Sequence, residues 1–550
     1  MKKIGILLCM LVVNAFAQDE EFKGETRWSE LLPVNKTTTA PDIIGQDGSS
    51  IYITRLLKGK RVVEKYRLAN LTLEKSAQLD LTYNDKDLTL ASQFMFDGKP
   101  TLLTSFFNKK TKKSYMFLQF IDPSSLVVSA PKKIGDNYIN TKMNSLAFRM
   151  SGTYASYSAA NSFSFFQVSE NEEFCFALSS DINENTPEED VKSGNYNFKG
   201  TLVGDAGEVV GESKFKFPVS NFVPIESKIS NEGEVYFLGY KMMVDADAPK
   251  KVFGNSEKMK IGEVYMMILD PTTGEMAANE IKLEGKEIEM LSFNFSSDGG
   301  VNVGGLTNTG GRGVSGSFLV KYNKDFTEVS VTSVDFETDF ITAGWSEKKK
   351  EDLEKKKDKG KDVAEPQLYN YYIDHVIAKP DGSCLILAEQ YYVIVKTTTT
   401  TSANGGTTTT TTYYYYYNDI IAVNYDKNGD FAWKKVVKKI QRSVNDGGYY
   451  SSYFVVQQGN AVNIIYNDSE SNYVDTDGMS SYEIKALKRS TIGAKVNLTA
   501  EGEMSKVKLF EFEEGGLKLV PKVCASAGEK YVFLYARSKN GDKVGIIDLD

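Results

Sequence analysis

Short apolar segments alternate with polar turns along most of the chain, and the same order of segments recurs. Each unit has a polar and aromatic segment, a glycine-containing turn, an apolar segment, a variable loop, a second apolar segment, a polar turn and a last segment. Valine, isoleucine, threonine, tyrosine and phenylalanine dominate the apolar segments, which favours β-strands. The first apolar segments of the eight units are Ser50–Thr54, Thr101–Ser105, Phe174–Leu178, Val235–Tyr240, Val301–Leu306, Cys384–Glu389, Val462–Tyr466 and Tyr531–Ala536.

The spacing of these units indicates one repeat architecture. Most of the turns before the apolar segments contain glycine, often as Asp-Gly, and such turns reach positive φ at low cost and close tight hairpins. Eight units divide the 533 residues after residue 17 at a spacing of about 67 residues. Because a repeat of four short antiparallel strands is typical of a propeller blade, we predict an all-β chain that folds as a β-propeller of about eight four-stranded blades. A seven-bladed ring and tandem β-sandwiches are the alternatives.

The last unit stops at Asp550, where other units continue with a turn and a fourth strand. An open sheet edge is a pairing liability, so propellers commonly take the missing strand from the N-terminal part of the chain. The segment ETRWSELLP, before the first complete unit, is a suitable donor. We therefore predict that residues near Arg27–Leu31 close the ring. An ordinary N-terminal arm is the alternative.

A threonine- and tyrosine-rich tract, TTTTTSANGGTTTTTTYYYYY, lies between the second and third strands of the sixth unit. We predict that it lengthens their hairpin into a protruding β-ribbon over residues 391–418, because an eleven-residue arm spans about 36 Å. A two-residue type I′ turn at Asn404 and Gly405 would pair Thr401 with Thr408 and give five threonine pairs. The same register places Val395 opposite Tyr414.

The tyrosines at the base of this ribbon are the candidate binding residues. Aromatic side chains offer large contact areas to proteins and sugars. The candidate residues are Tyr413, Tyr414, Tyr415, Tyr416 and Tyr417.

Two other segments interrupt the repeat as inserted loops, at residues 241–260 and 346–366. The second begins SEKKKEDLEKKKDKGKD, in which acids nearly balance lysines and the apolar content is too low to pack a core. We predict a solvated loop there, with transient helix favoured by Glu/Lys pairs four residues apart.

The first 17 residues have the pattern of a secretory signal peptide. Lys2 and Lys3 precede the apolar run Ile4–Val13, and Ala-Phe-Ala stands before Gln18. We therefore expect one propeller domain over residues 18–550, exported to the periplasm, the cell surface or the extracellular space. No later segment approaches 18 consecutive apolar residues, so we expect no transmembrane span in the mature chain. The net charge of −8 argues against a nucleic-acid partner.

Motifs for catalysis and for metal binding are missing from the sequence. The single histidine, His375, excludes most histidine-based triads and all multi-histidine zinc sites, and we expect it on the inner strand of the sixth unit. Asp426–Asp430 begins like a calcium loop but lacks the glutamate that ends an EF-hand loop, so a hairpin turn accounts for it. Cys175, Cys384 and Cys524 suit small buried hydrophobes. We expect no catalytic residue, no cofactor and no metal site.

The turns at Asn424–Lys435 (NYDKNGDFAWKK) and Asp270–Glu275 (DPTTGE) and the short Lys-Lys signal peptide resemble those of exported bacterial β-propeller repeat proteins, in particular those of Bacteroidota. The resemblance implies the fold and an exported location, and it implies no activity. The favoured hypothesis is a non-catalytic scaffold of the bacterial cell envelope that binds a protein or a polysaccharide. The alternatives are a secreted hydrolase that acts on glycans or peptides through channel carboxylates, and a structural envelope protein without a specific ligand.

Overall fold

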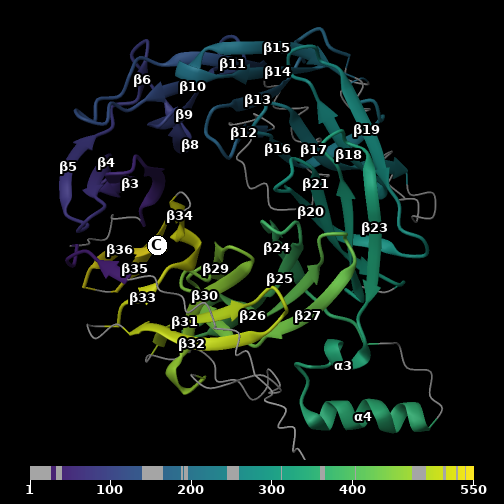
Figure 1. Ribbon diagram of the computed structural model, residues 1–550. Coiled ribbons are helices and arrows are strands. Elements are labelled where there is room, and N and C mark those ends of the chain that lie inside the picture. The colour runs from purple at the N-terminus through teal and green to yellow at the C-terminus, as the bar shows by residue number, and fades with distance from the viewer. Residues whose placement is uncertain are drawn as a thin grey trace, which may run out of the picture.

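Eight antiparallel sheets are arranged in a ring (Figure 1). The computed structural model describes residues 26–32, 40–138, 165–187, 190, 196–244, 259–310, 313–359, 366–402, 404–472, 491–511, 516–527, 530–538 and 540–549. The predicted signal peptide, residues 1–17, lies outside the described residues. We number the sheets one to eight in chain order.

The first four sheets contain four strands each. Sheet one consists of β2 (Asp42–Gln46), β3 (Ser50–Leu57), β4 (Lys60–Arg67) and β5 (Leu73–Gln78). Sheet two consists of β8 (Thr89–Phe96), β9 (Lys99–Asn108), β10 (Lys113–Phe120) and β11 (Lys132–Tyr138). Sheet three consists of β12 (Phe165–Val168), β13 (Cys175–Ser180), β14 (Phe198–Val203) and β15 (Val209–Phe215). Sheet four consists of β16 (Phe222–Ile229), β17 (Val235–Val244), β18 (Met259–Leu269) and β19 (Met276–Ile281). A small hairpin of β6 (Thr82–Tyr83) and β7 (Lys86–Asp87) joins sheets one and two.

The other four sheets continue the same order. Sheet five consists of β20 (Glu287–Phe295), β21 (Val301–Asn308), β22 (Gly316–Tyr322) and β23 (Glu328–Asp335). Sheet six consists of β24 (Tyr371–Ala378), β25 (Cys384–Thr401), β26 (Thr407–Tyr425) and β27 (Phe431–Val437), with β28 (Gln441–Val444) also paired to β26. Sheet seven consists of β29 (Tyr453–Gln458), β30 (Ala461–Ser469), β31 (Thr491–Leu498) and β32 (Met504–Glu511). Sheet eight consists of β33 (Lys518–Leu519), β34 (Ala525–Ala527), β35 (Tyr531–Arg537), β36 (Asp542–Asp548) and β1 (Thr26–Trp28).

The chain order of strands within each sheet confirms the predicted repeat. Each of the eight apolar segments expected from the sequence takes the second place in the pairing order of its sheet, namely β3, β9, β13, β17, β21, β25, β30 and β35. In sheet eight, β33 and β34 both pair with β35 and together take the first place. First strands of neighbouring sheets contact each other, as β2 contacts β8 and β20 contacts β24. The first strands therefore lie innermost and the fourth strands outermost, as in a β-propeller (Figure 1).

Eight clusters of buried apolar side chains hold the ring together in the described part of the chain. Each cluster lies between two consecutive sheets. The cluster between sheet eight and sheet one includes Ile51 and Ile53 on β3 and Phe533 and Ile546 on β35 and β36. Burial of each large apolar side chain contributes about 1.5–3 kcal/mol, so the packing between sheets stabilises the whole ring.

The three cysteines of the described chain are buried free thiols. Cys384 packs between sheets five and six, and Cys175 and Cys524 lie in two other inter-sheet clusters. Burial raises the pKa of the Cys384 thiol to about 12. The prediction that the cysteines act as small buried hydrophobes is confirmed.

The N-terminal strand β1 pairs with β36 in the last sheet, where Arg27 lies opposite Ile546. The Arg27 guanidinium is 3.2 Å from the Asp548 carboxylate, and the Trp28 ring meets Phe510 of sheet seven at 5.5 Å between ring centroids. A further bridge joins Leu32 to Asp542. Sheet eight thus takes its outer strand from the segment that precedes sheet one.

Both predicted inserted loops contain more regular structure than expected. In the segment 241–260, β17 and β18 remain paired as far as Val244 opposite Met259, and residues 245–258 lie outside the described residues. In the segment 346–366, the helix α4 (Glu347–Asp358) follows the short helix α3 (Thr338–Ile341) and has no buried residue (Figure 1). Ion pairs one turn apart, such as Lys355 with Glu351 at 3.0 Å, favour the helix over the predicted loop.

Candidate functional site

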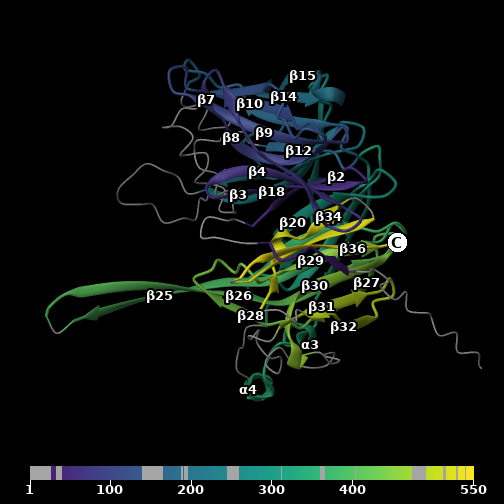
Figure 2. The ribbon, with the colours of Figure 1, turned by 90° about the vertical axis from the view of Figure 1, so that its left-hand side faces the viewer.

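The hairpin of β25 and β26 continues far beyond sheet six as a two-stranded ribbon. Figure 2 shows this ribbon projecting from one face of the ring. The innermost strand β24 stops pairing with β25 at Gln390, whereas β25 and β26 pair as far as Thr401 opposite Thr407. We call the segment from Tyr391 to Tyr417 the ribbon.

The ribbon has the predicted number of threonine pairs but a different register. Five Thr–Thr pairs are present, and Thr401 faces Thr407 rather than the predicted Thr408. Val395 faces Tyr413 instead of Tyr414. The prediction of the individual partners was therefore wrong by one residue along the whole ribbon.

Two local features set this register. Ser402 donates its N–H to the carbonyl of Gly406 at 2.8 Å, so three residues, not two, lie in the turn, and Gly405 has a φ of +78°. At the other end, β26 carries one extra residue, since Asn418 and Asp419 stand opposite Gln390 alone. Such a β-bulge shifts the pairing by one position.

The five candidate tyrosines do not form a single surface, because side chains alternate between the two faces of a strand. Tyr413, Tyr415 and Tyr417 lie on the face that also carries Val393 and Val395, their cross-strand neighbours. The other face carries Tyr414 and Tyr416, and the Arg442 guanidinium of β28 lies 4.9 Å and 5.7 Å from their ring centroids. The exposed fraction falls from 43% at Tyr413 to 7% at Tyr417.

Tyr417 fixes the root of the ribbon to the ring. Its ring packs against Tyr391 at 4.6 Å between centroids. Its hydroxyl accepts a 2.6 Å hydrogen bond from the Lys522 ammonium, which also lies 4.4 Å from the ring centroid. Lys522 belongs to the short helix η3 (Pro521–Val523), which lies between β33 and β34 of sheet eight. The contact therefore joins sheets six and eight, which do not follow one another along the chain.

A buried ion pair lies beside this root. The Lys439 ammonium binds the Glu389 carboxylate, and both side chains are almost fully buried. Ser452 donates a 2.7 Å hydrogen bond to the second Glu389 oxygen, and the Lys439 ammonium also donates to the carbonyl of Tyr417 at 3.3 Å and to Gln441 at 3.2 Å. Because the charges are paired and hydrogen-bonded, the cluster can be buried without a large penalty.

An accessible carboxylate, Asp374, lies on the inner strand next to this cluster. It accepts a 2.9 Å hydrogen bond from the Tyr453 hydroxyl of sheet seven. Desolvation by the surrounding protein, and to a smaller extent the charge of Glu389, raises the pKa of Asp374 above its usual value. Asp374, Tyr453, Glu389 and Lys522 thus gather at the ribbon side of the inner strands.

Asp374 occupies a β-bulge that recurs around the ring. The pairing of β24 with β25 skips from Ile373 to His375, and the first strands of sheets one, two, four and five are irregular at corresponding places. The bulged residue of sheet five is a second accessible carboxylate, Glu289. Bulges re-aim side chains and are frequent beside functional sites.

The single histidine lies on the inner strand of the sixth unit, β24. His375 is half-buried, and its ring meets Tyr453 at 5.7 Å between centroids. Burial, with a smaller effect of Lys228, lowers the pKa of His375 to about 4. The imidazole is therefore neutral near pH 7 and serves packing.

Several cavities lie at different places on the ring. One, of about 450 Å³, is lined by the inner strands of sheets one and two and by Lys522, with Asp42, Arg61 and Gln93 among its polar residues. Its walls carry both charges and few large apolar side chains. Lys522 connects this cavity to the root of the ribbon.

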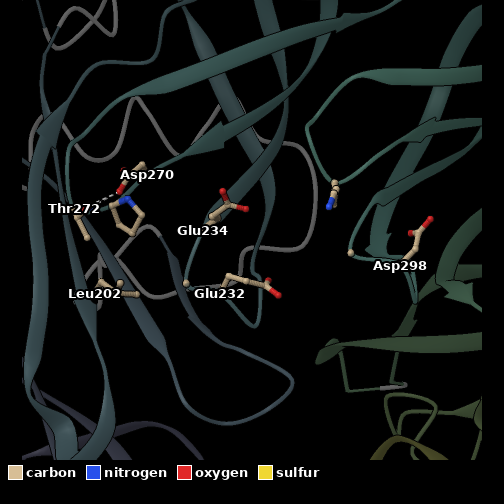
Figure 3. A pocket seen from close by; sticks show the side chains of 10 residues that line it. Leu202, Glu232, Glu234, Asp270, Thr272 and Asp298 are labelled. Atoms are coloured by element: carbon tan, nitrogen blue, oxygen red, sulfur yellow. Dashed lines mark hydrogen bonds between the residues drawn. The ribbon is translucent and has the colours of Figure 1, made fainter.

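Another cavity, of about 540 Å³, is lined by turns that join first to second and third to fourth strands (Figure 3). Since the ribbon joins a second strand to a third, the two features lie at opposite ends of the antiparallel strands. Its acidic residues include Glu232, Glu234, Asp270 and Asp298. Asp270 accepts hydrogen bonds from Thr272 and Thr273, and Asp298 from Ser296 and Gly300, so these two carboxylates cap their own turns.

The described residues contain no group of three or more histidine, cysteine or carboxylate side chains that could hold a metal ion. Within the same ranges, no helix is both long and apolar enough to cross a membrane. The sequence predicts only the tyrosines as site residues. The other members of this cluster, which the sequence did not indicate as site residues, are Asp374, Glu389, Lys439 and Lys522. The one sequence signal for this cluster is Glu389, a charge at the end of the apolar run CLILAE.

Comparisons with known proteins found similar folds, but at low sequence identity and low TM-score. No protein-family model matches this chain, and no curated protein sequence matches it. The solved Dos1 propeller is similar with a TM-score of 0.42 and 8% identity, over 94% of this chain and 96% of that chain. The polysaccharide lyase Uly1 has a TM-score of 0.35 and 10% identity, over 86% and 93% of the two chains. The α-L-arabinanase of Penicillium chrysogenum, complexed with arabinobiose, has a TM-score of 0.31 and 10% identity, over 76% and 98%. At these scores the comparisons carry no argument about activity.

Proposed function

We propose that this protein is a non-catalytic, exported scaffold of the bacterial cell envelope and that its ribbon contacts a protein or a polysaccharide. One observation carries the proposal: the ribbon holds large apolar side chains in solvent, away from every inter-sheet core. The exposed fractions are 36% at Val393, 49% at Ile394, 55% at Val395 and 43% at Tyr413. Val393, Val395 and Tyr413 lie on one face of the ribbon and form contiguous exposed apolar surface, which is typical of interaction sites, whereas Ile394 lies on the other face.

The ring supports this role as a rigid base. The root of the ribbon is held by the Tyr417–Lys522 hydrogen bond and by the buried pair of Glu389 and Lys439. A contact surface held by packed elements loses less conformational entropy on binding. Tyrosine faces suit both proteins and sugars, which fits the two partner classes. The expectation of export rests on the signal-peptide pattern of residues 1–17.

Affinity capture from cell-envelope extract tests the proposal. The wild type is compared with a variant that lacks Thr397–Thr412, with its arms joined by Asn-Gly, and with Val395→Ser combined with Tyr413→Ser. Val329→Ser is the matched control, because Val329 is 61% exposed on the outer strand of sheet five. We expect both ribbon variants to lose the same captured partners and the control to retain them. An identical set of partners for all four proteins would refute the proposal.

A second candidate function is hydrolysis of glycans or peptides at the inner strands. The Asp374–Tyr453 hydrogen bond favours it, since an accessible carboxyl with a raised pKa can act as a general acid. Incubation of the protein with cell-wall glycans and with peptides distinguishes the two functions. Product formation that disappears in Asp374→Asn would replace the scaffold by this second function.

A further inference from the structure

One edge of the ribbon is an unpaired strand edge. In the described part of the chain, no strand pairs with β25 beyond Gln390 on the side away from β26. The segment that is left free, from Val393 to Thr401, is rich in β-branched residues and carries a single charge, Lys396. Long exposed edges with such composition are templates for pairing with another strand.

The backbone groups that face this edge can be assigned. Tyr391 donates its N–H to the carbonyl of Asn370, on the side of β24. Successive residues of a strand direct their N–H and C=O groups to alternate sides. The residues that present these groups to the free edge are therefore Val393, Val395, Thr397, Thr399 and Thr401.

The opposite edge of the ribbon is shorter because β28 covers its base. β28 pairs with β26 from Tyr414 to Tyr417. Beyond it, Asn445 donates its N–H to the Tyr413 carbonyl at 3.0 Å, and the Tyr413 N–H donates to the Asn445 side chain at 2.8 Å. Only Thr407, Thr409 and Thr411 remain outward-facing there. The edge of β25 thus offers the longer free ladder.

We propose that the free edge of β25 pairs in antiparallel fashion with the same edge of a second copy of this chain. The inference rests on the proposed role of the ribbon as a contact surface and names its partner. A two-fold axis at Thr397 places Val393 opposite Thr401 of the second copy and Val395 opposite Thr399. Every residue that faces the edge then meets another such residue, and the ladder closes about ten hydrogen bonds, two for each hydrogen-bonded pair.

Charge and side-chain shape fit this symmetric pairing. The only charged residue, Lys396, faces Thr398 of the second copy, so no like charges are opposed. The outward-facing pairs join valine with threonine or threonine with threonine, and β-branched pairs across a ladder stabilise a sheet. A two-fold interface uses the same patch on both subunits, and this neutral edge is complementary to itself.

The position of the axis follows from the ring. β24 occupies the edge of β25 from Gln390 inward, so a second ribbon cannot extend past that point. An axis at Thr397 brings Thr401 of the second copy opposite Val393, just outside the ring. The two rings then lie at opposite ends of a four-stranded sheet formed by both ribbons.

Thr397→Pro tests the proposal because residue 397 faces the free edge. Proline removes the outward N–H and blocks the edge, yet it leaves the ladder with β26 intact, since the lost group does not face β26. Thr411→Pro is the matched control. Thr411 lies opposite Thr397, so this substitution removes the corresponding outward N–H on the β26 edge. The molar mass of both variants and of the wild type is measured by analytical ultracentrifugation over a range of concentrations.

As the concentration increases, we expect the molar mass of the wild type and of Thr411→Pro to rise from that of one chain to that of two. The dissociation constant of Thr397→Pro should be at least about tenfold higher. Oxidative cross-linking is the second readout. Thr397→Cys should form a covalent dimer at the two-fold axis, where the Cα atoms of a hydrogen-bonded pair are about 5.5 Å apart, and Thr411→Cys should not.

A wild type that stays a single chain at every concentration would overturn the proposal, as would equal association of Thr397→Pro and the wild type. These outcomes differ from failure of the proposed function. If the ribbon captures envelope partners while the chain stays monomeric, the scaffold function stands and the pairing of two copies is wrong. If two copies pair but the ribbon deletion loses no envelope partner, the pairing stands and the proposed scaffold function is wrong.

Discussion

The Tyr417 hydroxyl accepts a 2.6 Å hydrogen bond from the Lys522 ammonium. This bond links the root of the ribbon in sheet six to the inner part of sheet eight, across 105 residues of sequence. The Lys522 ammonium also lies 4.4 Å from the centroid of the Tyr417 ring. The root of the ribbon is therefore held by a contact between sheets six and eight, which are separated by sheet seven.

Removal of this hydroxyl should destabilise the ring modestly. In Tyr417→Phe, the Lys522 ammonium loses its acceptor but keeps the aromatic face. Because Lys522 is exposed and water can replace the acceptor, we expect a loss of about 0.5–1.5 kcal/mol in the free energy of unfolding, typical of a net hydrogen bond. Urea denaturation measures this loss. Tyr413→Phe, at the exposed end of the same tract, is the control and should change stability by less than about 0.5 kcal/mol.

The buried pair of Glu389 and Lys439 should be costly to break from one side. Lys439→Met leaves the Glu389 carboxylate buried without its cation, so we expect a loss of about 3–5 kcal/mol. The double variant with Glu389→Leu removes both charges and should recover a large part of that loss. Guanidinium denaturation of the two single variants and the double variant forms a cycle, and an additive result would contradict the coupling.

Shortening the ribbon should leave the ring intact. The threonines of the tip are exposed, so deletion of Thr397–Thr412 with an Asn-Gly junction should leave the melting temperature nearly unchanged. Domains of about 150–250 residues lose about 2–4 °C per kcal/mol. A fall of more than about 10 °C in calorimetry would show instead that the tip packs on the ring.

The raised pKa of Asp374 gives a signed pH dependence. The surrounding protein and the charge of Glu389 raise this pKa to about 7, whereas an unfolded aspartate titrates near 3.9. Between these values the folded chain binds more protons than the unfolded chain, so this group makes stability fall as pH rises from about 4 to about 7. Above about pH 7 the Asp374 carboxyl is ionised in both states, and the loss of stability caused by its charge in the folded chain is complete.

Asp374→Asn removes this titration. We expect the free energy of unfolding of the variant, relative to the wild type, to rise from pH 4 to pH 8 in urea denaturation at constant ionic strength. His375→Gln serves as the control on the neighbouring residue. Burial lowers the pKa of His375 to about 4, whereas an unfolded histidine titrates at about 6.5. Between these values the unfolded chain binds more protons than the folded chain, so this group makes stability rise with pH. The difference curve of His375→Gln should therefore have the opposite slope.

The amino-acid pattern alone determined the blades. Apolar β-branched segments between glycine-containing turns identify the second strand of each sheet, because strand alternation and hairpin turns are local properties of the chain. The same local pattern gives the long ribbon and its five threonine pairs. Charged pairs one turn apart also indicate helical tendency in residues 346–362, where the structure has α4.

Tertiary structure decided the register and the polar cluster. The one-residue shift in the ribbon arises where Asn418 and Asp419 stand opposite Gln390, and repeated threonines cannot select between registers by themselves. Asp374 and Glu389 lie on paired strands of sheet six, whereas Tyr453 of sheet seven and Lys522 of sheet eight reach them only because the three sheets pack side by side. Side-chain periodicity specifies which face of a strand is buried, whereas the neighbours across the centre of the ring depend on how all eight blades pack.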